Sequence, residues 1–153
     1  MPTVRPATPS DAETIASFNE AMAVETEGKT LDPGTIRAGV KALFARPELG
    51  FYLIAEEEGR AVGQLMVTYE WSDWRNGVFW WIQSVYVRKE SRGRGVYRAL
   101  HAAVKERAKR AEDVCGLRLY VERENGTAME TYRRTGMHET PYRLFEESWK
   151  GIG

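Results

Sequence analysis

Residues 85–100 read VYVRKESRGRGVYRAL, and this stretch decides most of what the sequence says about the fold. An apolar strand-like run ends at Val87, a basic loop with two glycines follows, and an amphipathic helix begins near Gly95. From Arg88 to Arg98 there are five positive residues and one acid, a local charge of +4 in a chain of zero net charge. Glycines and a helix N-terminus gather main-chain N–H groups and positive dipole at one point. The stretch therefore predicts a site for a phosphate or a pyrophosphate.

Two other phosphate-binding patterns do not fit this loop. No Gly-Lys-Ser/Thr follows the glycines, which excludes the P-loop, and only two of the three glycines of the dinucleotide fingerprint are present. Taken alone, the stretch is also compatible with a solvated basic turn ahead of an ordinary core helix.

The elements on either side of this loop alternate in a definite order. Apolar periodicity and turn residues predict strands at 3–6, 51–55, 61–69, 79–87, 117–121 and 144–149, and helices starting at Thr8 and Asp32 and spanning 95–111 and 125–135. Tight turns at residues 58–60 and 75–77 make the central strands antiparallel, and the strand–helix–strand unit that follows should be parallel and right-handed. The predicted fold is α+β (mixed α/β), in the order β-α-α-β-β-β-α-β-α-β. It is a central mixed, mostly antiparallel sheet with helices on both faces, within one domain over 1–153.

Composition excludes several classes of protein. The chain has 153 residues, 42% hydrophobic and 29% charged, with 22 Lys plus Arg against 22 Asp plus Glu. Zero net charge argues against a nucleic-acid partner. The single cysteine, Cys115, cannot form an internal disulfide, fits a cytoplasmic location, and is expected to be buried rather than reactive. The longest run of large apolar residues, Val78 to Ile82, is far short of the ~20 residues that span a bilayer, and acidic residues precede any apolar run at the N-terminus.

A second constellation follows the predicted strand at 117–121. Asn125, Ala128 and Tyr132 step by three and four residues and so share one face of a short helix, which Gly136 ends. Asn125 suits an N-cap, and Tyr132 offers a phenol with an ordinary pKa of about 10. Core packing is the alternative role for this tyrosine.

The two motifs, in this order, resemble the GNAT superfamily of acetyl-CoA-dependent N-acetyltransferases. The family's phosphate loop, Gln/Arg-x-x-Gly-x-Gly/Ala, is matched by residues 92–97, and its motif Asn-x-x-Ala-x-x-x-Tyr-x-x-x-Gly-Phe by residues 125–137. Two positions depart from the pattern. Tyr97 stands where the family prefers Gly or Ala, and Met137 replaces the usual Phe.

The resemblance implies acetyl-CoA as co-substrate and assigns roles to individual residues. Main-chain N–H groups from Gly93 to Arg98 would hold the pyrophosphate, and the main chains of Val85 and Val87 would pair with the pantetheine arm. The amide near Val85 would polarise the acetyl carbonyl, and Tyr132 would protonate the departing thiolate as general acid. The implied cofactor-binding residues are Val85, Val87, Arg92, Gly93, Arg94, Gly95, Val96, Tyr97, Arg98 and Asn125.

The acceptor side is less sharply marked. Transfer by direct attack of a primary amine in a ternary complex needs no nucleophilic side chain and no metal. Glu70 is the candidate base, and Glu25 and Glu27, in a polar linker, with Trp71 and Trp74, are candidates for binding a small cationic amine. The alternatives are that the two glutamates belong to a solvated loop and that the tryptophans form a structural aromatic hairpin.

The rival function is a non-catalytic acyl-CoA sensor or interaction domain. The neutral net charge disfavours RNA binding, and the sequence leaves the formation of a homodimer undecided.

Overall fold

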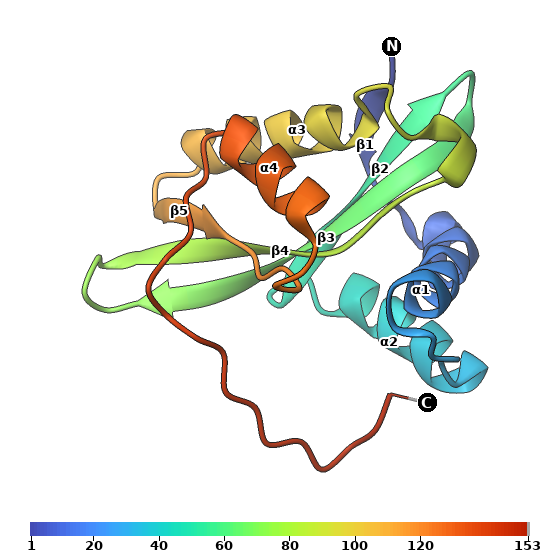
Figure 1. Cartoon of the computed structure of the whole chain (residues 1–153), viewed down its shortest axis with the longest axis horizontal. Coiled ribbons are helices and arrows are strands. Elements are labelled where there is room, and N and C mark those ends of the chain that lie inside the picture. The colour runs from blue at the N-terminus through green and yellow to red at the C-terminus, as the bar shows by residue number, and fades with distance from the viewer. Residues whose placement is uncertain (153) are drawn as a thin grey trace. The chain divides into compact units, whose positions relative to one another are not determined.

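The computed structural model describes residues 1–152 (Figure 1). The strands are β1 (Thr3–Pro6), β2 (Gly50–Glu57), β3 (Arg60–Ser72), β4 (Gly77–Val87) and β5 (Val114–Arg118). The helices are α1 (Ala12–Glu27), α2 (Pro33–Ala45), α3 (Val96–Arg110) and α4 (Gly126–Arg134), with 3-10 turns at Pro9–Asp11 and Lys89–Ser91. The chain divides into two compact units, Met1–Leu119 and a second that begins at Tyr120.

The first unit contains the whole sheet. Its strands lie in the order β1-β2-β3-β4-β5; neighbours from β1 to β4 are antiparallel, and β5 is parallel to β4. The turn at Glu58 and Gly59, both with positive φ, joins β2 to β3, and the turn with Asn76 at φ +48° joins β3 to β4. The predicted mixed, mostly antiparallel sheet is confirmed.

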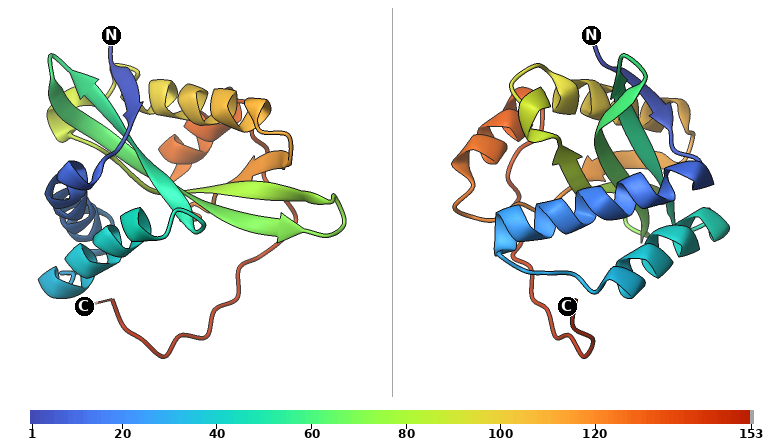
Figure 2. Two further views of the ribbon diagram at one scale, coloured as in Figure 1. Left: turned by 180° about the vertical axis from the view of Figure 1, so that it is seen from behind. Right: turned by 90° about the vertical axis from the view of Figure 1, so that its right-hand side faces the viewer.

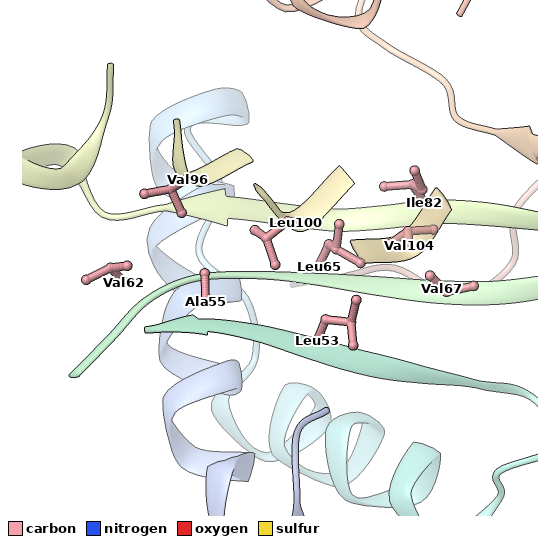
Figure 3. Close-up of a cluster of buried hydrophobic side chains, with 9 residues drawn as sticks. All are labelled: Leu53, Ala55, Val62, Leu65, Val67, Ile82, Val96, Leu100 and Val104. Atoms are coloured by element: carbon pink, nitrogen blue, oxygen red, sulfur yellow. The ribbon is translucent and has the colours of Figure 1, made fainter. Parts of the chain in front are cut away.

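Helices cover both faces of this sheet, α3 on one and α1 with α2 on the other (Figures 1 and 2). Alternation along β2 explains this arrangement, because Leu53 belongs to the core cluster under α3 and its neighbour Ile54 to the cluster under α1 and α2. Leu100 and Val104 of α3 are fully buried against the strands (Figure 3). The burial of one α3 face holds the helix against the sheet. It thereby positions the N-terminus of the helix and the loop before Val96.

Local sequence explains the starts of the first two helices. Asp32 caps α2 by accepting a hydrogen bond from the Thr35 N–H at 2.9 Å, and Pro33 occupies the first turn. Thr8 and Asp11 form a capping box around the 3-10 turn that precedes α1. Helix starts are therefore close to their predicted places.

Three details of the prediction were wrong. No strand forms at 144–149, where two apolar residues are followed by two acids, so the segment lacks the alternation of a half-buried strand. The strand predicted at 117–121 is β5, at Val114–Arg118. A Cβ at Gly116, inside this strand, would lie 2.8 Å from the Phe79 ring, so the close approach of the two strands requires glycine. The first half of the predicted polar linker at 25–30 is helical, since α1 runs to Glu27.

Within residues 1–152, the structure contains no helix with both the length and the apolar character needed to cross a bilayer.

Candidate functional site

The loop between β4 and α3 presents a row of main-chain donors. Gly93 and Gly95 have φ values of +74° and +82°, and a Cβ at either position would meet nothing within 4 Å. The first intrahelical bond of α3 runs from the Ala99 N–H to the Gly95 carbonyl at 3.0 Å. Among the described residues, the N–H groups of Gly93, Gly95 and Val96 have no protein acceptor. These donors, at the positive end of a 15-residue helix, fit the oxygens of a diphosphate.

The arginine side chains of this loop are partly occupied elsewhere. Arg92 donates from Nε to the Val87 carbonyl at 2.9 Å and from Nη2 to Glu25 Oε1 at 3.0 Å. Arg94 donates to Glu57 Oε1 at 3.3 Å. Two of the five positive charges from Arg88 to Arg98 are thus balanced by carboxylates, and the main-chain donors and the helix dipole add a directed attraction for an anion.

β4 has an open edge beside this loop. β5 pairs with β4 only from Val78 to Trp81, so within residues 1–119 no strand pairs with the same edge from Ile82 to Val87. The side chains of Val85 and Val87 pack on the core under α3. An extended ligand chain can therefore hydrogen-bond along this edge as an added strand would.

A β-bulge interrupts β4 at the start of this edge. β3 pairs Gln64 with Tyr86 and Met66 with Gln83, so one residue of β3 stands opposite two of β4. Ser84, in the bulge, has φ +51°, and its carbonyl accepts a hydrogen bond from Gln64 Nε2 at 3.1 Å. The sequence prediction missed both Gln64 and Ser84, because no local residue pattern marks a bulge held from a neighbouring strand.

Glu70, the candidate base, lies near the end of β3. Its carboxylate accepts a hydrogen bond from Arg118 Nη1 at 2.7 Å, and the Arg118 guanidinium carbon lies 3.6 Å from the centre of the Phe79 ring. The Glu70 side chain is 44% exposed. The structure thus holds this carboxylate in place by an arginine from β5.

Glu25 and Glu27 occupy the last turn of α1, before Gly28 at φ +63°. Glu25 faces Arg92 and hydrogen-bonds to Tyr86, whereas Glu27 lies 3.9 Å from Lys29. Burial acts to raise the pKa of Glu25, but the hydrogen bonds from Arg92 and Tyr86 outweigh it and lower that pKa. The structure therefore brings Glu25 to the loop between β4 and α3.

The aromatic residues of the β3–β4 hairpin divide into two groups. Trp80 packs against Phe51 and Tyr69, with ring centroids 5.2 and 5.9 Å away, beside the core under α3. Trp71 and Trp74 are 60% and 87% exposed. The second pair is the more exposed and offers the larger aromatic surface to a ligand or a partner, since Tyr69 is 39% exposed.

Cys115 and His101 lie outside the predicted site and differ in their burial. Cys115 is exposed, so the prediction that it is buried was wrong: in the short strand β5 its side chain points away from the core while the strand pairs along its main chain. His101 is buried on α3, as a helix-packing histidine, and its Nδ1 lies 3.1 Å from the Tyr97 hydroxyl.

The second unit carries the remaining two predicted residues. The Asn125 side chain caps α4 by accepting a hydrogen bond from the Ala128 N–H at 3.1 Å, as its position in the motif predicts. Burial raises the pKa of Tyr132 above its ordinary value. The phenol therefore stays protonated to higher pH than that of an exposed tyrosine.

The geometry agrees with a match to known proteins. The acetyltransferase (GNAT) family model matches residues 16–137. The chain belongs to the GNAT acetyltransferase family. It is similar to a possible acetyltransferase from Clostridium difficile 630, with 44% identity, 99% of each chain covered and a TM-score of 0.90.

Two more distant structures share the fold. A predicted acetyltransferase with acetyl-CoA from Clostridium acetobutylicum has 18% identity, 96% coverage of each chain and a TM-score of 0.78. AAC(6')-Iy in complex with the bisubstrate analog CoA-S-monomethyl-acetylneamine has 15% identity, coverage of 98% of this chain and 99% of that one, and a TM-score of 0.78. No curated protein sequence matches the chain.

Membership of the GNAT family confirms the predicted resemblance and fold class. It makes the chain an acetyltransferase-type protein of a family that uses acetyl-CoA. Across the part of the chain that the structure describes, no group of three or more His, Cys, Asp and Glu side chains is arranged to hold a metal ion.

Proposed function

We propose that the protein transfers the acetyl group of acetyl-CoA to a primary amine of a small cationic acceptor, with residues 1–153 acting as a single N-acetyltransferase domain. The observation that carries the proposal is the row of unpaired N–H groups at Gly93, Gly95 and Val96, beside the open edge of β4, in a chain of the GNAT family. The single thiol of the chain suits a reducing compartment such as the cytoplasm.

The cofactor would be held mainly by main chain. N–H groups from Gly93 to Arg98 would bind the pyrophosphate, and the edge at Val85 and Val87 would pair with the pantetheine arm. The Arg92 guanidinium would order the loop through the Val87 carbonyl. Asn125 would contact the pantetheine side from the N-terminus of α4.

The chemical step needs a carbonyl polarised and a thiolate protonated. The amine nitrogen attacks the acetyl carbon, the C–S bond breaks, and the amine's extra proton passes to a base. The amide near Val85 would stabilise the oxyanion, and the phenol of Tyr132 would donate its proton to the departing sulfur. A phenol is protonated at neutral pH, as a proton donor must be, and burial, which raises the pKa of Tyr132, extends that protonation to higher pH.

The acceptor would be recognised by carboxylates and exposed aromatic rings. Glu70 would accept the amine's proton, directly or through water, with Arg118 fixing its position. Glu25 and Glu27 at the end of α1 would bind the amine by exchanging their ion pairs with Arg92 and Lys29 for it, and Trp71 and Trp74 would supply apolar surface. Such a surface attracts a cationic amine with an apolar body.

Thiol release from saturating acetyl-CoA, measured over a panel of primary amines, tests the proposal. Stoichiometric release of CoA and acetylation of at least one cationic small amine is the expected result. Binding of CoA without turnover of any amine would favour a non-catalytic acyl-CoA sensor instead. A reaction confined to anionic acceptors would contradict the acceptor class.

A further inference from the structure

Gln64 is a fully buried polar side chain on β3, with 0% of its surface exposed. Its Nε2 donates to the Ser84 carbonyl at 3.1 Å, and its Oε1 is buried with no hydrogen-bond partner among the described residues. A buried acceptor without a partner destabilises a fold. The contact with Ser84 fixes the side-chain orientation, because the opposite flip would place two carbonyl oxygens against each other.

Ser84 is the residue that this hydrogen bond holds. Its φ of +51° lies in the left-handed region, where a residue with a Cβ is strained. Such a conformation persists only where surrounding groups hold it. Gln64, reaching across from β3 at the register shift, is the side chain that does so here.

The bulge lies directly before Val85. Its conformation sets the direction of the peptide plane between Ser84 and Val85, and so of the Val85 N–H. An oxyanion donor must point at the developing charge to be effective.

We infer that Gln64 is a positioning residue for acetyl transfer, which holds the Ser84 bulge so that the Val85 N–H faces the thioester carbonyl. The inference rests on the proposed function. It assigns to Gln64 an effect on the chemical step rather than on cofactor affinity, because the pyrophosphate is held separately by the loop that begins at Gly93.

The test compares Gln64→Met, which keeps the side-chain length and removes the donor, with Asn19→Leu as a matched control. Asn19 is also a buried amide that donates to a main-chain carbonyl, that of Ile15, but it lies on α1 and not beside the bulge. Gln64→Met should lower kcat about 10- to 100-fold, since the oxyanion donor is misdirected rather than removed. Calorimetry should give a CoA dissociation constant within about threefold of wild type, and Asn19→Leu should change kcat less than about threefold.

A rescue experiment separates positioning from general destabilisation. Glycine adopts the left-handed conformation without support, so Ser84→Gly in the Gln64→Met background should recover most of the lost kcat. Ser84→Val, tested with Gln64 intact, should lower kcat in the same way, because a β-branched residue resists positive φ. If Gln64→Met does not fold, Ser84→Val tests the inference in its place.

Unchanged kcat in a folded Gln64→Met protein would overturn the inference. So would an equal loss in Asn19→Leu, or a loss in Gln64→Met that Ser84→Gly does not reverse. A wild-type protein that neither binds CoA nor acetylates an amine would instead refute the proposed function, so the two failures are distinguishable.

Discussion

Arg92 and Glu25, 67 residues apart in the chain, form an ion pair with Nη2 and Oε1 separated by 3.0 Å. Glu25 lies in the last turn of α1, where the helix dipole disfavours a negative charge. Arg92 compensates that charge and also binds the carbonyl at the end of β4. The pair therefore ties the end of α1 to the loop between β4 and α3.

Glu25→Gln should destabilise the protein at neutral pH and not in acid. The pKa of Glu25 is lowered in the folded state, so its contribution is present above the unfolded-state pKa of about 4.3 and is lost as the pH falls through the lower folded-state value. Urea unfolding at pH 7 and near pH 3 measures this, with Glu27→Gln as control. A loss of stability that is equal at both pH values would show that the pair is not the cause.

Tyr132→Phe should lower kcat by about 10²- to 10⁴-fold, the range for loss of a general acid, with an unchanged dissociation constant for CoA. Because burial raises its pKa above about 10, wild-type activity should show no loss from phenol ionisation below that pH. Steady-state rates between pH 6 and 10 measure both points. Tyr142→Phe, at an exposed position, is the control; equal turnover in the Tyr132 and Tyr142 variants would remove Tyr132 from the mechanism.

Gly63→Ala should destabilise the fold by about 1–3 kcal/mol through overpacking. A Cβ at Gly63 would lie 2.9 Å from Val96 Cγ1 and 3.1 Å from the Tyr86 carbonyl oxygen, where α3 meets the sheet. Gly39→Ala is the contrast, because the interior of α2 has open space there and the change should stabilise the protein by up to about 1 kcal/mol. Urea midpoints that move in the same direction for both variants would contradict this packing.

Cys115 should react with a thiol reagent in the native protein, since its side chain is exposed. Labelling without denaturant should modify one thiol per chain, and Cys115→Ser should retain wild-type turnover because direct attack by the amine uses no cysteine. Labelling that requires denaturant would place the thiol in the interior instead.

Much of the fold could be predicted because local patterns agree with it. The alternation in β2, the Asp32 cap and the turns at Glu58 and Asn76 are each encoded within a few residues. The prediction of a strand at 144–149 was wrong because the local pattern there does not determine the structure. Backbone hydrogen bonds of a strand come from a partner, and a short run of apolar residues does not specify one.

One part of the candidate site could be predicted from the sequence, and another part could not. The loop at Gly93 and Gly95 is readable because positive φ and a helix start leave a mark in the sequence. The pairing of Glu25 with Arg92, and that of Gln64 with Ser84, joins residues far apart in the chain. Only the three-dimensional arrangement shows such contacts, and no spacing rule in a single sequence predicts them.

Calorimetric titration of the protein with CoA tests the central claim most directly. The donors from Gly93 to Arg98 should bind the pyrophosphate, so CoA should give saturable heat at one site per chain, whereas pantetheine, which lacks the diphosphate, should bind far more weakly. Absence of heat with CoA, or equal affinity for CoA and pantetheine, would contradict the account.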